Sequence, residues 1–355
     1  MEIVIRTSIR GRGASSNPPN RFEKMRYEDD PDLEIDPEDS PRPATMFLRD
    51  PTRTIIARND SPDVPFETSV NPYRGCEHGC IYCFARPSHE YLGFSAGLDF
   101  ETKILVKEEA PRLLREEISS AKWKPQVIAM SGVTDCYQPI EKKLRLTRGC
   151  LEVLAEFRNP VVIITKNHLV TRDVDLLAGL AAVNAAAVFI SVTTLDSELA
   201  RRMEPRTSSP EMRLEAVRTL SAAGIPTGVL VAPIIPAITD HEIPRILKAA
   251  AEAGAVSASY TILRLPYAVA PLFEKWLDEH FPEKKDRVIS RIHQLRDGKM
   301  NDPRFSSRLR GEGIFSEQIK SLFTIAKRRA GLQDRSMELS VDSFRRPARS
   351  QMELF

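Results

Sequence analysis

FETSVNPYRGCEHGCIYCF, residues 66–84, joins a short run typical of a β-strand, residues 66–72, to a loop with three cysteines. Cys76, Cys80 and Cys83 stand in the spacing Cys-x3-Cys-x2-Cys. Thiolates are soft ligands that select zinc or iron–sulfur clusters. Because only short loops separate the three cysteines, one tight turn can bring their sulfurs to one face of a metal centre. The segment therefore predicts a metal site directly after the first strand of the core.

Three kinds of site fit this spacing. In a cubane iron–sulfur cluster, three thiolates leave one iron open to a substrate or cofactor, whereas an electron carrier normally has a fourth cysteine. A structural zinc site of the Cys3His type would take His78 or His89 as its fourth ligand. The three thiols could also be unrelated. A zinc site usually has a second close pair, but Cys136 and Cys150 stand alone far downstream, so the sequence favours the cluster.

Beyond this loop, short apolar runs alternate with amphipathic helical stretches. The predicted strands are residues 66–72, 127–130, 161–165, 188–193, 228–235 and 259–263. The predicted helices between them are residues 111–122, 144–157, 173–182, 210–223 and 242–253. Continuous apolar strands that alternate with helices indicate a parallel sheet with crossover helices. We therefore predict an α/β fold, a partial (β/α)6 TIM-like barrel, with its chemistry at the C-terminal ends of the strands.

The chain divides into three predicted parts. Residues 1–60 are rich in Pro, Arg, Asp and Asn without periodicity, so we expect an irregular N-terminal arm that is partly disordered or draped over the core, with a short strand at 54–57. Residues 61–266 form the predicted barrel. Residues 267–355 are predicted to be a helical C-terminal extension with a basic surface and an irregular tail. Its predicted helices are residues 272–280, 287–295 and 317–329.

Composition excludes several classes of protein. The chain has 355 residues and is 42% hydrophobic, enough for a sizeable core, while five cysteines are too few for a disulfide scaffold. The N-terminus shows no signal-peptide pattern, and no apolar run reaches the length of a membrane span. We expect a soluble, cytoplasmic protein with no membrane partner, in a reducing compartment.

Charge is unevenly distributed although the net charge is only +2. Residues 28–39 hold eight acids and no base, and residues 284–310 hold nine bases and three acids. Solvated surface is the simplest interpretation of both runs. The basic run, which includes Arg304, Arg308 and Arg310, could also follow phosphates, although no aromatic stacking pattern interleaves it in the sequence.

The cysteine triad, with the aromatic Tyr82 just before Cys83, resembles the radical S-adenosylmethionine (SAM) superfamily. The resemblance implies that Cys76, Cys80 and Cys83 bind a [4Fe-4S] cluster, that SAM chelates its open iron, and that Tyr82 approaches the adenine. One electron from the cluster, supplied by a flavodoxin or ferredoxin type donor, would cleave SAM into methionine and a 5′-deoxyadenosyl radical. This radical would abstract hydrogen from a substrate.

Residues near the ends of the predicted strands are expected to surround SAM. They are Ser131, Gly132, Thr134, Lys166, Ser191 and Arg206. By position, the segment at Ser131 and Gly132 resembles the small-residue segment of the superfamily that holds the SAM amino group. Lys166 could pair with the SAM carboxylate, as could Arg206. Ser191 could meet the ribose or carboxylate.

Within the superfamily, residues 66–265 resemble the spore photoproduct lyase branch, often described as DNA repair photolyase-like, and a bacterial subgroup of it. The resemblance rests on residues 71–76, 131–135, 165–166 and 204–207. It implies lyase chemistry on a nucleic acid. The lyase donates hydrogen from a cysteine whose place is taken here by Met130. Cys136 is therefore the candidate donor, and the missing cysteine weighs against photoproduct repair.

A second class of function is a metal-stabilised iron–sulfur or zinc binding module without catalysis. A structural metal site does not need an open, polar barrel mouth, yet Ser131, Lys166 and Ser191 are expected to make one. The sequence therefore favours a radical SAM enzyme over this alternative.

Overall fold

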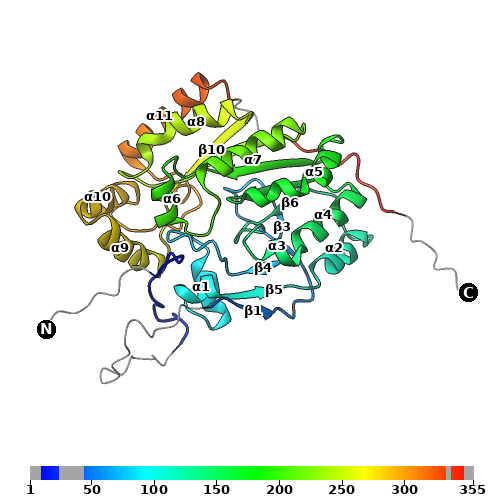
Figure 1. Ribbon diagram of the computed structural model, residues 1–355, viewed down its shortest axis with the longest axis horizontal. Helices are drawn as coiled ribbons and strands as arrows, with labels where there is room; N and C mark the ends of the chain where they lie inside the picture. The colour runs from blue at the N-terminus through cyan, green and yellow to red at the C-terminus, as the bar shows by residue number, and fades with distance from the viewer. Residues whose placement is uncertain (1–8, 24–43, 333–336, 348–355) are drawn as a thin grey trace, which may run out of the picture.

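The computed structural model describes residues 9–23, 44–332 and 337–347. Its centre is a seven-stranded sheet in the order β10-β9-β8-β7-β6-β3-β2, with helices packed around it (Figure 1). The strands are β2 Ile56–Arg58, β3 Thr68–Val70, β6 Ile128–Met130, β7 Val161–Thr165, β8 Ala186–Ser191, β9 Thr227–Ile234 and β10 Ser257–Ile262. All neighbours pair in parallel except β2, which is antiparallel to β3.

This topology confirms the predicted partial barrel. The predicted strands all appear, and strand β7 has the predicted bounds. The helices between the strands also match: α2 Ala110–Ser119, α4 Leu146–Phe157, α5 Val174–Ala181, α7 Pro210–Ala222 and α8 Ile243–Glu252. Within the described residues the edge strands β2 and β10 do not pair with each other, so the sheet curves without closing.

Local sequence explains where these elements begin and end. Helix α7 follows Ser209, whose side chain accepts a hydrogen bond from the backbone N–H of Met212, and Pro210 occupies its first turn. Gly224 follows with φ +75°, a left-handed conformation that ends helices at little cost to glycine. In β7, Val161, Ile163 and Thr165 are buried in alternation with less buried residues, as a strand between neighbours requires.

The sequence did not predict a second, small sheet. It has the order β1-β5-β4 and consists of β1 Met46–Arg49, β5 Lys103–Val106 and β4 Tyr73–Arg74. Strand β1 lies inside the region expected to be irregular and pairs in parallel with β5. The predicted strand at 54–57 corresponds to β2. The acidic run 28–39 lies within residues 24–43, outside the described residues.

The C-terminal helices pack against the barrel. They are α9 Val269–His280, α10 Lys285–Leu295 and α11 Gly313–Arg329. Helix α11 lies against α8, as Figure 1 shows, and the ring of Phe323 lies 4.6 Å from that of Tyr260 in β10. The three-part division of the chain stays a prediction. None of the helices in the described residues has the length and apolar character needed to cross a lipid bilayer.

Candidate active site at the cysteine loop

The three cysteines lie on one tight loop that follows β3 and β4. The backbone N–H of Gly79 donates to the carbonyl of Cys76 at 3.3 Å, and that of Cys83 donates to the carbonyl of Cys80 at 3.2 Å. Gly79 has φ +66°, and a Cβ there would lie 2.6 Å from a carboxylate oxygen of Glu101. All three thiols are free of disulfides. The three cysteines therefore share one compact, hydrogen-bonded loop, and their joint binding of a metal centre stays a prediction.

A buried ion pair holds this loop in place. Arg86 donates from Nε to the carbonyl of Cys80 at 3.0 Å and from Nη2 to the carbonyl of Gly79 at 3.2 Å. The same Nη2 lies 2.5 Å from Oε1 of Glu101, and both side chains are fully buried. The guanidinium thus fixes two loop carbonyls while Glu101 balances its charge.

The N-terminal arm closes over the same carboxylate. The backbone N–H groups of Gly13 and Ala14 donate to Glu101 at 3.0 and 2.9 Å. The approach is so close that a Cβ on Gly13 would lie 1.7 Å from the carbonyl oxygen of Gly79. In Figure 1 this blue segment runs between α1 (Leu98–Thr102) and α9. Residues 9–23 therefore drape over the cysteine loop.

The three thiols need a positively charged partner before they can lose their protons. Burial raises the pKa of Cys76 and Cys80 well above the usual range of a thiol. Burial also raises the pKa of Cys83, opposed by Arg86 and by backbone N–H groups. Metal binding deprotonates such thiols because the positive charge of the metal offsets the free-energy cost of burying the thiolates.

The donor set fits a cluster better than a single zinc ion. A structural zinc ion needs four donors about 2.0–2.3 Å from one centre, and in the described residues no three His, Cys, Asp or Glu side chains converge in that way. His78 Nδ1 lies 3.4 Å from Asp135, and its Nε2 lies 3.2 Å from the amide of Asn167. His89 Nε2 lies 2.9 Å from the carbonyl of Lys103. A cluster spreads its thiolates over different irons.

Beside the loop lies a buried polar network centred on Glu204. Its Oε1 accepts hydrogen bonds from Tyr82 Oη and, at 2.7 Å, from Thr193 Oγ1. Its Oε2 accepts from Arg213. Burial raises the pKa of Glu204, and the charge of Arg213 opposes this shift. The network fixes the ring of Tyr82, one residue before Cys83.

Lys166, at the end of β7, joins this network. Its Nζ donates to the carbonyl of Ala232 at 2.8 Å and to Thr193 Oγ1 at 3.2 Å, and it lies 3.4 Å from Glu204 Oε1. Burial lowers the pKa of Lys166 to about 8. The ammonium lies 5.8 Å from the ring centroid of Tyr82. The structure therefore brings Lys166 and Tyr82 together beside the cysteines, as expected.

The small-residue segment after β6 uses its hydroxyls internally. Ser131, at φ 105°, donates to the carbonyl of Ile164 at 2.6 Å, and Thr134 Oγ1 donates to the carbonyl of Tyr73 at 3.1 Å. Gly132 has φ +71°. A ligand at this segment would therefore meet backbone groups more readily than these two hydroxyls, and a role in SAM binding stays a prediction.

The other candidate residues take different places. Arg206 Nη1 lies 3.2 Å from Glu77 in the cysteine loop. Ser191 is buried, and its carbonyl accepts a hydrogen bond from Arg213. Cys136 is fully buried, with its sulfur 3.4 Å from Ser131 Oγ. A role for Cys136 as hydrogen donor stays a prediction.

Sequence reasoning assigned no role to three residues of this region: Asp135, Glu204 and Arg213. Asp135 accepts hydrogen bonds from Thr165 Oγ1 at 2.8 Å and from the backbone N–H of Lys166 at 2.8 Å. Two of the three, Asp135 and Glu204, lie inside segments used for the family resemblance, residues 131–135 and 204–207. No local pattern indicates their partners, because Tyr82 and Glu204 stand 122 residues apart.

Some bases of the run 284–310 have partners in the fold. Arg304 pairs with Asp302 and Glu312 at 2.7 and 2.9 Å. Arg308 pairs with Asp63, and Arg296 is buried and donates to the carbonyls of Ser307 and Leu263. The run therefore offers less open positive charge than its composition indicates.

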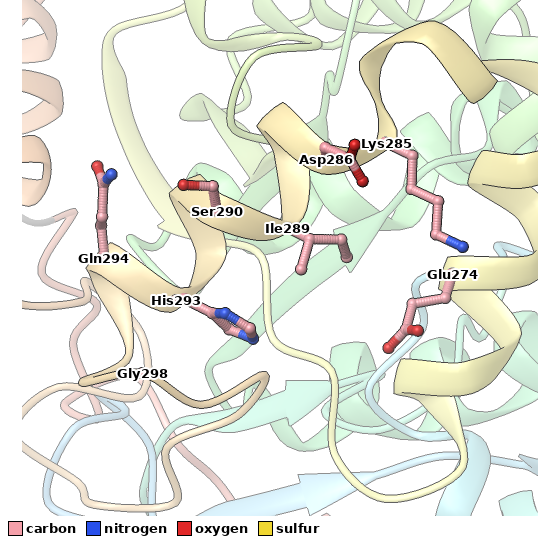
Figure 2. A pocket seen from close by; sticks show the side chains of 8 residues that line it. All are labelled: Glu274, Lys285, Asp286, Ile289, Ser290, His293, Gln294 and Gly298. Atoms are coloured by element: carbon pink, nitrogen blue, oxygen red, sulfur yellow. The ribbon is translucent and has the colours of Figure 1, made fainter.

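A surface hollow of about 580 Å³ lies away from the cysteine loop. Figure 2 shows it between Glu274 of α9 and a row of α10 side chains that includes Lys285 and His293. Its lining contains no residue of the cysteine loop or of the strand ends. This hollow therefore does not belong to the candidate active site.

Comparisons with known proteins agree with this geometry. The radical SAM superfamily matches residues 70–250. An uncharacterized protein from Mycobacterium tuberculosis is 37% identical over 250 residues, 70% of this chain and 72% of that protein. An uncharacterized protein from Methanocaldococcus jannaschii is 29% identical over 222 residues, 62% of this chain and 79% of that protein.

A solved structure shares the fold at low sequence identity. A mutant of spore photoproduct lyase matches with a TM-score of 0.50 and 16% identity, over 80% of this chain and 78% of that one. The extent of the superfamily match, which begins at the end of β3 and includes the cysteine loop, decides the assignment. The chain belongs to the radical SAM superfamily.

Proposed function

We propose that this protein is a radical SAM enzyme that cleaves SAM reductively at a [4Fe-4S] cluster held by Cys76, Cys80 and Cys83. One observation carries the proposal. Three thiols, two of them buried and that of Cys83 partly buried, share one loop at the C-terminal end of the first parallel strand, beside the ammonium of Lys166 and the fixed ring of Tyr82. Catalytic groups of such barrels lie at this end of the strands. The cluster, when bound, supplies the electron that splits SAM into methionine and a 5′-deoxyadenosyl radical.

The residues of the chain have distinct roles in this proposal. The cysteine thiolates would hold the cluster, and Arg86 with Glu101 keeps their loop rigid. Lys166 offers a cation to the carboxylate of SAM. Glu204 orients Tyr82 through a hydrogen bond, so that the ring can lie against the adenine. The draped N-terminal arm shields the loop and limits the access of water to the reaction.

The substrate and partners follow from the resemblance to the spore photoproduct lyase branch. We assign the protein a nucleic-acid substrate, a lyase-like reaction that begins with hydrogen abstraction, and a flavodoxin or ferredoxin type electron donor. The similarity of fold to spore photoproduct lyase supports this assignment by analogy. Such donors and an oxygen-sensitive cluster are compatible with a cytoplasmic location.

The deciding experiment is anaerobic reconstitution with iron and sulfide, reduction with dithionite, addition of SAM, and quantification of 5′-deoxyadenosine. Wild type is compared with Cys80→Ala. The matched control is Cys150→Ala, which removes another buried thiol, in α4. We expect the cluster absorbance and the deoxyadenosine to fall to background in Cys80→Ala and to persist in Cys150→Ala. Equal deoxyadenosine in wild type and Cys80→Ala would contradict the proposal.

A further inference from the structure

Arg264 lies at the mouth of the barrel, and its guanidinium has no carboxylate bonded to it in the part of the chain that the structure describes. It stands two residues beyond the end of β10 and makes no side-chain hydrogen bond or ion pair with the described residues. Its Nε is buried without an acceptor. The nearby carboxylate of Asp63 is occupied by Arg308. A partly buried guanidinium in this state is unfavourable until an anion pairs with it.

An exposed aromatic ring lies next to this cation. Phe84 directly follows Cys83 and is 46% exposed, although a large apolar side chain is normally buried. The guanidinium carbon of Arg264 lies 5.2 Å from its ring centroid. The pair thus places a half-exposed ring next to a guanidinium that has no ion pair among the described residues, and Phe84 directly follows Cys83, a proposed cluster ligand.

A second pair extends the same surface. Phe305 is 48% exposed, and the guanidinium carbon of Arg308 lies 4.5 Å from its ring centroid. Burial lowers the pKa of Arg264, and the positive charge of the nearby Arg308 lowers it further, whereas Asp63 opposes the shift. We call Phe84, Arg264, Phe305 and Arg308 the aromatic–arginine rim. The fold adds Phe84 and Arg264, which stand far apart in the sequence, to the Phe305–Arg308 pair of the basic run.

The side chains of the aromatic–arginine rim indicate which kind of ligand it binds. An exposed ring offers stacking to a planar group, and the adjacent guanidinium offers hydrogen bonds to an anion. Nucleotides carry a planar base and a phosphate in alternation, and proteins bind single strands by this combination of ring stacking and positive charge. Bases in a duplex already stack on one another and are not free for such contacts.

We propose that Phe84 stacks an unpaired base of the substrate and that Arg264 binds an adjacent phosphate, with the Phe305–Arg308 pair continuing the path. This inference rests on the proposed function for the nature of the substrate. A strand bound on the rim would place the next nucleotide beside the cysteine loop, where hydrogen abstraction is expected.

The test is equilibrium binding of a fluorescein-labelled oligothymidylate of ~12 nucleotides, a length within the site sizes of single-strand binders. Fluorescence anisotropy is recorded with the reconstituted full-length protein at several salt concentrations, under anaerobic conditions. The variants are Phe84→Leu and Arg264→Gln. The controls are Phe47→Leu, since Phe47 is 45% exposed on β1, and Arg218→Gln, on the surface of α7.

We expect Phe84→Leu to weaken binding about tenfold without changing the salt dependence, because a stacking contact carries no charge. Arg264→Gln should weaken binding and lower the slope of log K against log[salt] by about 0.7, the contribution of one phosphate contact on a single strand. Both controls should bind like wild type. Cluster absorbance and the midpoint of urea unfolding check that the variants fold, and Arg264→Gln should not lower that midpoint.

Three results would overturn the inference: wild type that does not bind the oligonucleotide at low salt, variants that both bind like wild type, or a duplex that binds as tightly as the single strand. None of these depends on deoxyadenosine formation. A protein that binds the strand through Phe84 and Arg264 but does not cleave SAM would refute the proposed function alone.

Discussion

The buried ion pair beneath the cysteine loop gives a quantitative prediction for Glu101→Gln. Both carboxylate oxygens accept from N–H donors: Oε1 from Arg86 at 2.5 Å and Ala14 at 2.9 Å, and Oε2 from Gly13 at 3.0 Å. The amide of glutamine must therefore turn its NH2 group towards an N–H donor in either orientation. Arg86 would also keep a buried charge without a partner, and breaking a buried ion pair in this way costs about 3–5 kcal/mol.

Urea unfolding of the apoprotein, followed by far-ultraviolet circular dichroism, measures this cost. With an m-value of about 3 kcal/mol per M, the midpoint should fall by about 1 M or more. The matched control is Glu116→Gln, whose carboxylate pairs with Arg112 on the surface at side-chain exposures of 59% and 55%. An exposed pair contributes about 0–1 kcal/mol. If Glu101→Gln changes the midpoint no more than the control does, the loop is not held by this ion pair and the argument is wrong.

Further predictions concern the arm, the network and the cofactor. Gly13→Ala should displace the N-terminal arm and speed the loss of the cluster in air, because its Cβ would meet the carbonyl of Gly79. The control Gly179→Ala, at an open position in α5, should leave the rate of cluster loss unchanged. It should also stabilise the folded protein by up to about 1 kcal/mol. Glu204→Gln should leave Arg213 without its carboxylate partner and lower the urea midpoint of unfolding. An unchanged midpoint would show that Glu204 does not hold the buried network together. Lys166→Met should keep its cluster, measured by iron content. Its Kd for SAM should rise about tenfold or more, as expected for loss of a charged hydrogen bond. An unchanged Kd would show that Lys166 does not bind SAM.

Much of the fold could be predicted because it depends on local patterns. Apolar runs such as Val161–Thr165 form strands in a parallel sheet almost regardless of which apolar residues they contain. Ser209 and Gly224 set the two ends of α7. The small sheet β1-β5-β4 could not be predicted, since β1 has only four residues and three of them are exposed. Its stability comes from pairing with β5, which stands more than fifty residues later in the chain.

The sequence by itself determined the kind of site, since three thiols within eight residues must share one loop wherever that loop lies. It also determined the parallel sheet, because periodicity and composition act through neighbours in the chain. Only the tertiary structure decided what surrounds the loop. It placed Glu204 against Tyr82, Glu101 between Arg86 and the N-terminal arm, and Arg264 beside Phe84. It also gave Arg304 and Arg308 of the basic run acidic partners and Arg296 carbonyl partners. Such pairings depend on burial and on contacts between distant segments, and no local pattern encodes them.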